Sequence, residues 1–209
     1  MRKLRKFVKN RILKLSHQRK DMDRTKKKWE LIKKYLPEEP GSLLDIGSSE
    51  GFFTRNAALM GWCSLGIERL GAAVNYANKM AKKEKNKNVF FAQGEMNLTV
   101  AKNLPDFDVI IMASTFQEIC SAYGLEEGYQ IFDNILRACK KVLIFETSTT
   151  NRKYGAKSPI FEIENEVESV ERWVKSLVAR SPGWGVSYGG KIAYSAKEPY
   201  RFMFTIKKD

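Results

Sequence analysis

From Ser42 onward, short apolar runs alternate with longer segments that carry apolar residues at helical spacing, and this alternation constrains the fold most. The apolar runs are SLLDIG, CSLGIE, NVFFAQ, DVIIMAS and KVLIFETS. The intervening helical patterns cover residues 52–60, 70–83 and 125–138. Strand–helix alternation of this kind is typical of a parallel sheet with helices on both faces. The sequence therefore predicts an α/β, doubly wound fold.

The pattern changes after Thr150. A polar loop leads into a predicted helix over about 162–179, and two predicted strands follow it, GVSYGGKIAYSA and YRFMFTIK. An antiparallel strand at the end of an otherwise parallel sheet is a common finish. A chain of 209 residues is long enough for one α/β domain and short for two. We predict a seven-stranded sheet, mostly parallel with an antiparallel C-terminal strand, in one domain that covers 37–209.

Most of the positive charge lies at the N-terminus. The chain carries a net charge of +13, and residues 1–34 hold 15 Lys and Arg against three acidic residues. The remainder is therefore nearly neutral. At about 100° per residue, six apolar side chains of this segment fall on one face of a helix. They are Leu4, Phe7, Val8, Ile12, Leu15 and Met22. We predict a basic amphipathic helical arm over residues 1–36.

The second half of this arm predicts a separate helix. Asp23 is a suitable N-cap, and Trp29, Ile32 and Leu36 fall on one stripe of the helix that would follow it. Two prolines in LPEEPG end the pattern, because proline cannot continue a helix. Three hypotheses fit the arm: it binds an anionic membrane surface through residues 1–24, it binds RNA, or its apolar stripe packs on its own domain.

The cysteines and apolar runs indicate the cellular compartment. Cys63, Cys120 and Cys139 are odd in number and lack Cys-x-x-Cys spacing, so we expect neither a disulfide framework nor a metal site. No apolar run approaches the roughly 18 residues that span a bilayer. The basic start also lacks the apolar core of a secretory signal. We expect a cytoplasmic protein that is soluble or attached peripherally to the inner membrane face.

The segment LLDIGSSEGFFT, residues 43–54, has the composition of a ligand-binding loop between a strand and a helix. A dinucleotide loop needs G-x-G-x-x-G, so that its middle glycine can lie against a pyrophosphate. Here Ser49 occupies that position, and Glu50 would repel phosphate. No Gly-Lys-Ser/Thr follows, which excludes a P-loop. The loop therefore suits a ligand without phosphates.

Five segments in this order resemble the motifs of class I S-adenosylmethionine-dependent methyltransferases, over residues 42–150. They are LLDIGSSEGFFT, LGIERL, FFAQGEMN, FDVIIMASTFQEI and KKVLIFETS. The resemblance implies a Rossmann-like fold, methyltransferase activity and S-adenosyl-L-methionine as cofactor. A sulfonium and a primary ammonium are both cationic, so an acidic loop without phosphate-binding features is appropriate for them.

The resemblance also assigns roles to residues at the strand ends. Asp45 would orient the amino-acid portion of the cofactor, with the Gly47 backbone beneath it, and Glu68 would bind both ribose hydroxyls. Glu95 would lie near the adenine amino group, with Met96 or Asn97 as alternatives. The implied cofactor-binding set is Asp45, Gly47, Ser48, Gly51, Glu68, Arg69, Glu95, Met96 and Ser114.

Candidate catalytic residues follow the fourth and fifth predicted strands. Gln117 and Glu118 occupy positions that face substrate in relatives. The single histidine, His17, lies in the arm, so a histidine base in the pocket is excluded. Gln117, Glu118 and Glu146 remain as candidates for a base or for acceptor binding, with Tyr123 as a further one. Glu118 could equally cap the following helix.

Two classes of acceptor fit the sequence. The first is a small molecule, a glycan or a lipid-linked molecule that receives the methyl group on oxygen, because a basic amphipathic arm suits anionic lipid. The style of the first motif also resembles methyltransferases associated with surface polysaccharides. The alternative is RNA, with the arm on its phosphates. STFQ lacks the Pro-Pro of amino-group methyltransferases, and the lysine of ribose methyltransferases is missing, so both absences count against RNA. A third class is a non-catalytic module that binds the cofactor or a partner protein.

Overall fold

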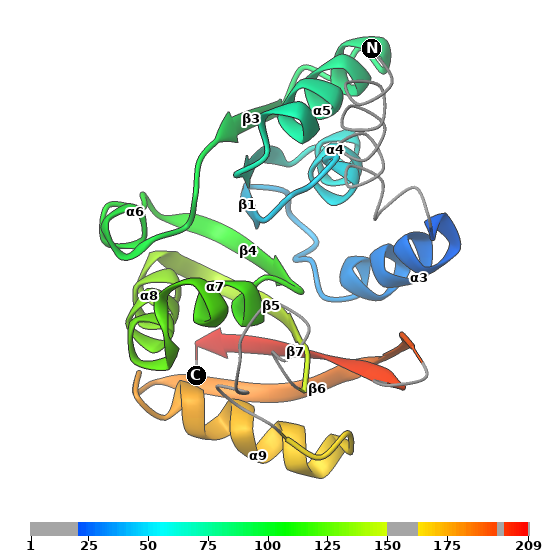
Figure 1. Cartoon of the computed structure of the whole chain (residues 1–209). Helices are drawn as coiled ribbons and strands as arrows, with labels where there is room; N and C mark the ends of the chain where they lie inside the picture. The colour runs from blue at the N-terminus through cyan, green and yellow to red at the C-terminus, as the bar shows by residue number, and fades with distance from the viewer. Residues whose placement is uncertain (1–20, 150–162, 196–198, 209) are drawn as a thin grey trace, which may run out of the picture.

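A seven-stranded sheet with the strand order β3-β2-β1-β4-β5-β7-β6 forms the centre of the molecule (Figure 1). The computed structural model describes residues 21–149, 163–195 and 199–208. The strands are β1 Ser42–Ile46, β2 Cys63–Glu68, β3 Val89–Gln93, β4 Phe107–Ala113, β5 Cys139–Thr147, β6 Trp184–Ala193 and β7 Tyr200–Lys208. Strands β1 to β5 pair in parallel, whereas β7 is antiparallel to both β5 and β6. The predicted mostly parallel sheet with an antiparallel C-terminal strand is confirmed.

The order of the strands reverses beside β1. The chain first builds outward from β1 to β2 and β3, then returns to place β4 on the other side of β1. In the register of these strands, Asp45 pairs with Gly66 of β2 and with Ile111 of β4. In open parallel sheets a ligand binds at the carboxyl ends of the strands next to such a reversal. The end of β1 is therefore where the fold favours a binding site.

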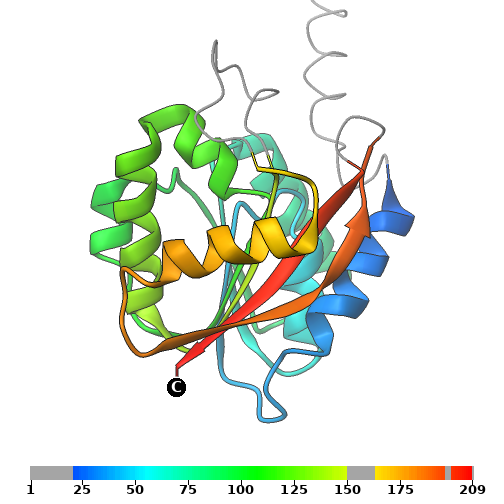
Figure 2. The same ribbon diagram turned by 90° about the horizontal axis from the view of Figure 1, so that it is seen from below.

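Helices cover both faces of the sheet, as predicted (Figure 2). The helices are α3 Met22–Lys33, α4 Phe52–Leu59, α5 Gly71–Lys83, α6 Leu98–Lys102, α7 Phe116–Tyr123, α8 Leu125–Ala138 and α9 Val167–Val178. One buried cluster joins α3 and α4 to one face, and the other joins α6, α7, α8 and α9 to the opposite face. The helix predicted over about 162–179 begins later, at Val167, and Ile163 packs against the core from the segment before it.

The start of α3 corrects one prediction. Asp21, and not Asp23, is the N-cap: its Oδ1 accepts a hydrogen bond from the backbone N–H of Arg24 at 3.0 Å. Asp21 also forms an ion pair with the Arg24 side chain. Asp23 lies in the first turn, where a negative charge is favourable. The helix ends at Lys33, so Leu36 lies beyond it. Residues 1–20, with most of the predicted amphipathic helix, lie outside the described residues.

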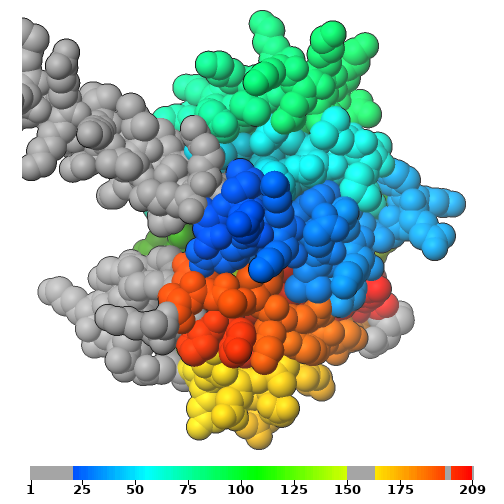
Figure 3. Space-filling view, turned by 90° about the vertical axis from the view of Figure 1, so that its right-hand side faces the viewer, coloured from blue at the N-terminus to red at the C-terminus, as the bar shows by residue number. Residues whose placement is uncertain are grey.

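Helix α3 packs tightly on the domain. Trp29 and Ile32 are buried, and the Trp29 ring stacks on the ring of Phe53 in α4 with centroids 6.2 Å apart. The Tyr35 hydroxyl donates a hydrogen bond to the carbonyl oxygen of Gly189 in β6 at 2.7 Å. Figure 3 shows α3 seated between the α4 segment and the C-terminal strands. We propose on these contacts that the arm ends before Asp21, rather than at residue 36.

Candidate functional site

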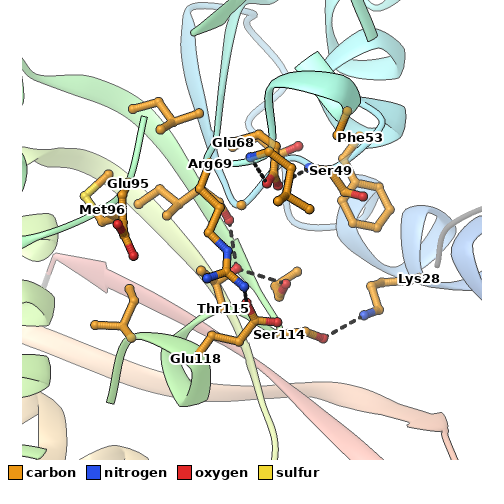
Figure 4. Close-up of a pocket in the computed structure, with 18 of the residues that line it drawn as sticks. Lys28, Ser49, Phe53, Glu68, Arg69, Glu95, Met96, Ser114, Thr115 and Glu118 are labelled. Atoms are coloured by element: carbon orange, nitrogen blue, oxygen red, sulfur yellow. Dashed lines mark hydrogen bonds and ion pairs between the residues drawn. The ribbon is translucent and has the colours of Figure 1, made fainter. Parts of the chain in front are cut away.

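A cavity of about 510 Å³ opens at the carboxyl ends of β1, β2 and β4 (Figure 4). It lies where the strand order reverses, which is the position that the topology favours for a ligand. The loop after each of these strands contributes to its wall, as do the segment after β3, helix α3 and the C-terminal strand β7. Seven of the nine predicted cofactor-binding residues line it. They are Asp45, Gly47, Glu68, Arg69, Glu95, Met96 and Ser114.

The loop after β1 forms one wall through its backbone. Gly47 has a φ of 74°, and a Cβ there would lie 2.5 Å from Thr115 Oγ1. That hydroxyl donates a hydrogen bond to the carbonyl oxygen of Ile46 at 2.9 Å, which ties the loops after β1 and β4 together. Only glycine fits this approach. Ser49 also lines the cavity, with a positive φ of 52°. The close backbone approach leaves space for a ligand over Gly47.

Glu68 at the end of β2 has a carboxylate of fixed direction. Its Oε2 accepts a hydrogen bond from the backbone N–H of Ser49 at 3.0 Å, and its Oε1 accepts one from the N–H of Leu70 at 2.8 Å. The side chain borders the cavity but is only 8% exposed. Each oxygen can still accept a second hydrogen bond. This carboxylate is therefore suited to bind two adjacent hydroxyl groups.

Asp45 at the end of β1 is a buried acid at the cavity wall. Burial raises its pKa to about 6, although hydrogen bonds from Thr54 oppose the shift; the negative charge of Glu68 adds to the rise. The Thr54 hydroxyl donates to Asp45 Oδ2 at 2.7 Å. A raised carboxyl pKa means that the ionised form is poorly compensated by the protein itself. A cationic ligand beside Asp45 would supply the missing compensation.

Glu95 and Met96 lie on the side of the cavity opposite Lys28 (Figure 4). Glu95 is exposed and Met96 is buried, so the two combine a polar edge with an apolar surface. Burial, together with a hydrogen bond to Glu95 and its charge, raises the pKa of Tyr123, which lines the same cavity. An apolar surface with a polar edge is suitable for a flat heterocycle.

Arg69 and Glu118 form an ion pair at the rim, with Arg69 Nη2 and Glu118 Oε2 3.7 Å apart. Both side chains are about half exposed, at 59% and 46%. Each lines the cavity, so both predicted residues are brought to it. The pair connects the loop after β2 with α7 (Figure 4).

Four predicted site residues do not line the cavity. Gly51 caps α4, and a Cβ there would lie 2.5 Å from the ring of Phe91, so this glycine serves close packing. Ser48 is buried against β2. Gln117 is buried, and its amide donates to the Ser114 carbonyl at 2.7 Å. Glu146 is fully buried, and its Oε2 accepts hydrogen bonds from Lys28 and Ser114. We propose that Gln117 and Glu146 position Ser114 rather than contact substrate.

One wall of the cavity consists of Arg24, Lys28 and Arg201 around Tyr194, and the motifs did not predict it. We call it the basic wall. Lys28 Nζ donates to Glu146 Oε2 at 2.7 Å and to Ser114 Oγ at 3.3 Å. Ser114 Oγ donates to the same Glu146 oxygen at 2.6 Å. Burial opposes the ionisation of Glu146, but the charges of Lys28 and Arg201 and these hydrogen bonds outweigh it and hold its pKa below the usual value. Glu146 is therefore ionised and neutralises part of the positive charge of Lys28 and Arg201.

One sequence pattern could have identified Lys28. Thr25, Lys28, Trp29 and Ile32 have the spacing of one helix face. The two apolar members of this set are buried, so Lys28 beside them had to be directed inward. Arg24, Tyr194 and Arg201 complete the wall and gave no comparable pattern. Arg24 lies one turn before Lys28 on α3, whereas Tyr194 and Arg201 come from the C-terminal part of the chain. Only the packing of α3 on the C-terminal strands brings them together.

The cavity fits the cofactor implied by the sequence. Its cofactor side offers carboxylates, a close backbone approach and an apolar surface, and these suit a cationic nucleoside without phosphates. Within residues 21–149, 163–195 and 199–208, no group of three or more His, Cys, Asp or Glu could hold a metal ion. The same residues include no helix that is long and apolar enough to cross a membrane.

Comparisons with known proteins bear on the family and the fold of the chain. Residues 38–192 match the family model described as a methyltransferase domain. No curated protein sequence matches the chain.

Solved structures share the fold of the chain, and three of them are described by their likeness to it. The bifunctional kinase-methyltransferase WbdD is 18% identical with a TM-score of 0.65, over 92% of this chain and 39% of WbdD. A SAM-dependent methyltransferase from Aquifex aeolicus is 21% identical with a TM-score of 0.56, over 86% of this chain and 88% of that one. Magnesium protoporphyrin IX methyltransferase from Synechocystis PCC 6803, with bound SAM, is 15% identical with a TM-score of 0.59, over 94% and 82%. The chain thus spans about two fifths of the length of WbdD.

Proposed function

Because the chain belongs to the methyltransferase-domain family and has the fold of class I S-adenosylmethionine-dependent methyltransferases, we propose that it methylates an oxygen of a small-molecule, glycan or lipid-linked acceptor. S-adenosylmethionine is the methyl donor. The observation that carries the assignment of the cofactor pocket is the Glu68 carboxylate, which two backbone N–H groups orient at the carboxyl end of β2. That carboxylate accepts hydrogen bonds from the two ribose hydroxyls.

The other cofactor contacts follow from the same cavity. Asp45 holds the ammonium of the amino-acid portion, and the Gly47 backbone lies beneath it. Glu95 and Met96 hold the adenine at the other side (Figure 4). This arrangement directs the sulfonium toward the loop after β4, where Ser114 lines the cavity.

The chain contributes chiefly position to the reaction. The cofactor supplies a methyl group that its sulfonium already activates for in-line displacement. The residues around the cavity hold the acceptor oxygen in line with that carbon and exclude competing water. Glu118 at the rim is our candidate for the base that removes a hydroxyl proton. Its partner Arg69 is exposed, so a bound acceptor can displace that ion pair at small cost.

Calorimetry with S-adenosylmethionine and S-adenosylhomocysteine tests the cofactor assignment. We expect both to bind the folded chain, and Glu68→Ala to weaken binding at least tenfold, because the ribose hydroxyls lose their acceptor. Glu171→Ala is a matched control, since Glu171 lies on α9, forms an ion pair with Lys175 and does not line the cavity. Absence of heat with either ligand in a folded sample would refute the assignment. Equal affinity of the two variants would mean that the ribose binds elsewhere.

The basic segment 1–20 is our candidate for attachment to an anionic membrane surface. Apolar side chains beside lysines and arginines suit the headgroup region, and each added basic residue there contributes about 1 kcal/mol. A chain that begins at Asp21 keeps the whole of α3 and serves as the comparison. We expect the full chain, but not the shortened one, to sediment with phosphatidylserine vesicles at physiological salt. Retention on RNA instead of vesicles would favour the RNA alternative.

A further inference from the structure

The two ends of the cavity carry opposite charges. Asp45, Glu68 and Glu95 line the end that we assign to the cofactor. Arg24, Lys28 and Arg201 line the other end, together with Tyr194 and Ser114. In Figure 4, Lys28 points toward Ser114 from the side opposite Glu95 and Met96. A cationic cofactor accounts for the acidic end. It does not account for three basic side chains beside it.

The basic end is built around the ring of Tyr194. The Arg24 guanidinium lies 4.7 Å and the Arg201 guanidinium 3.9 Å from the centroid of that ring. Arg24 Nη1 also donates to the Tyr194 carbonyl oxygen at 3.1 Å. Stacking on a ring holds a guanidinium flat and in a fixed orientation. The two arginines are therefore ordered before any ligand binds.

The acidic partners of this wall do not cancel its charge. Lys28 and Arg201 both contact the Glu146 carboxylate. Its Oε2 lies 2.7 Å from Lys28 Nζ, and its Oε1 lies 4.0 Å from Arg201 Nε. Arg24 pairs with Asp21 at the edge, where the Asp21 side chain is 42% exposed. Among the described residues, three cations thus face two carboxylates, one fully buried and one 42% exposed. Arg24 and Lys28, whose side chains are 27% and 13% exposed, line the cavity and can contact a ligand there.

This wall lies outside the part of the chain that the methyltransferase family shares. The family model covers residues 38–192, whereas Arg24, Lys28, Tyr194 and Arg201 all fall before or after it. The residues assigned to the cofactor fall inside it. This division is expected if the family shares a cofactor, bound by residues inside the family model, while the acceptor differs between members and is bound by residues outside it. The location of the wall therefore connects it with acceptor recognition.

We propose that the basic wall is a subsite for an anionic group of the methyl acceptor, a phosphoryl or carboxylate group, with Arg24 and Lys28 as its contacts. The proposal rests on the proposed function, because it places the acceptor beside the bound cofactor. Two of the five N–H groups of Arg24 donate to Tyr194 and Asp21, and the remaining ones can bind oxygens of such a group. Lys28 adds a point charge. Arg201 contributes its charge from behind, being only 1% exposed. The acceptor oxygen that receives the methyl group then lies near Ser114.

The test uses the full chain saturated with S-adenosylhomocysteine and three aromatic probes of similar size. Phenyl phosphate and benzoate present the two anionic groups, and benzyl alcohol is the neutral comparison. We expect at least one anion to bind at least tenfold more tightly than benzyl alcohol, with amide chemical-shift changes at Ser114 and Tyr194. Preference between the anions identifies the group. Equal binding of the neutral and both anionic probes would overturn the proposal.

Variants on α3 supply matched controls. Arg24→Gln should weaken binding of the preferred anion at least fivefold. Lys33→Gln removes the same charge from the same helix, but Lys33 pairs with Glu30 and does not line the cavity, so binding should change less than twofold. Equal losses in both would mean a general charge effect and refute the subsite. The double variant Lys28→Met/Glu146→Gln removes one positive and one negative charge, so the net charge of the wall is unchanged, and it should also lose anion binding. S-adenosylhomocysteine affinity, measured first, separates this result from a failure of the cofactor assignment.

Discussion

The two ends of the pocket each contain a buried carboxylate, and the two carboxylates behave in opposite ways. Burial raises the pKa of Asp45 to about 6 at the cofactor end. At the basic end, Glu146 is buried as deeply, yet Lys28 and Arg201 keep its pKa below the usual value. The difference lies in the neighbours and not in the depth. The protein compensates the charge of Glu146, whereas hydrogen bonds from Thr54 and the charge of Lys28 compensate that of Asp45 only in part.

The same comparison separates function from architecture. An uncompensated buried charge reduces the stability of the empty protein, so its presence is explained by what it binds. A compensated one holds distant elements together, here α3 with β5 and β7. We infer that the cofactor end is built for binding at a cost in stability. The basic end is anchored by an internal charge network, and only its excess charge is available for a ligand.

The largest expected effect comes from removing the ion pair between Lys28 and Glu146. Lys28→Met leaves Glu146 buried without its main partner, and we expect the free energy of unfolding to fall by about 3 to 5 kcal/mol at neutral pH. Lys28→Met/Glu146→Gln should recover only part of that loss, because the buried carboxylate is gone but Arg201, which is 1% exposed, loses this partner. Chemical denaturation measures both. The double variant should bind S-adenosylmethionine within threefold of the original chain. A tenfold loss there would show that the two ends are not separate.

The next effect concerns Asp45. Its folded pKa of about 6 lies above the ordinary value of 3.8, so its contribution to stability is full below pH 4 and is lost as pH rises through 6. At pH 8 the ionised side chain costs roughly 2 to 3 kcal/mol. Asp45→Asn removes that cost, and its amide oxygen can still accept from Thr54. We expect the empty variant to be more stable at pH 8 and unchanged near pH 4, by thermal unfolding at both values.

That variant should lose at least tenfold in affinity for S-adenosylmethionine, because the amide no longer compensates the ammonium. Stability and binding would then change in opposite directions. Loss of both together would indicate that Asp45 is a packing residue instead of a ligand for the cofactor.

A smaller effect follows from the titration of Asp45. With a pKa of about 6, this side chain is mostly ionised at pH 7 and mostly protonated at pH 5. If only the ionised form compensates the ammonium, affinity for S-adenosylmethionine falls about tenfold between these values. Calorimetry at pH 7 and pH 5 measures the ratio. Asp45→Asn should show no such dependence, and a similar slope in that variant would assign the titration to another group.

The contrast between the ends also explains what the sequence could predict. Asp45, Gly47 and Glu68 lie at the ends of strands that the apolar runs already indicate, and parallel strands bring their carboxyl ends to one edge. Local patterns therefore sufficed to place them. Ser48 and Gly51 belong to the same motif, but the turn directs them into the protein, and a motif does not show which side of a turn faces the ligand.

The basic end depends on contacts between residues that are far apart in the sequence. The Arg24–Tyr194 hydrogen bond joins positions 170 residues apart, and the Lys28–Glu146 pair joins positions 118 apart. No periodicity within either segment contains that information. Glu146 illustrates the limit well: as a polar residue after a predicted strand it suggested a catalytic role, and only its burial shows that it lies behind Lys28 and Ser114.

The smallest expected effect on stability lies at the rim between the two ends. Arg69 and Glu118 are 3.7 Å apart and about half exposed, so their ion pair adds little to stability. Glu118→Gln should change the unfolding free energy by less than about 0.5 kcal/mol and leave cofactor affinity within twofold. If Glu118 is the base for a hydroxyl acceptor, the rate of methyl transfer to that acceptor nevertheless falls by about 100-fold. An acceptor whose attacking oxygen is already anionic needs no base, and its rate would be unaffected by the same substitution. A comparison of Glu118→Gln with Arg69→Gln, in labelled methyl transfer to hydroxyl and anionic acceptors, therefore distinguishes a catalytic rim from one that only borders the entrance.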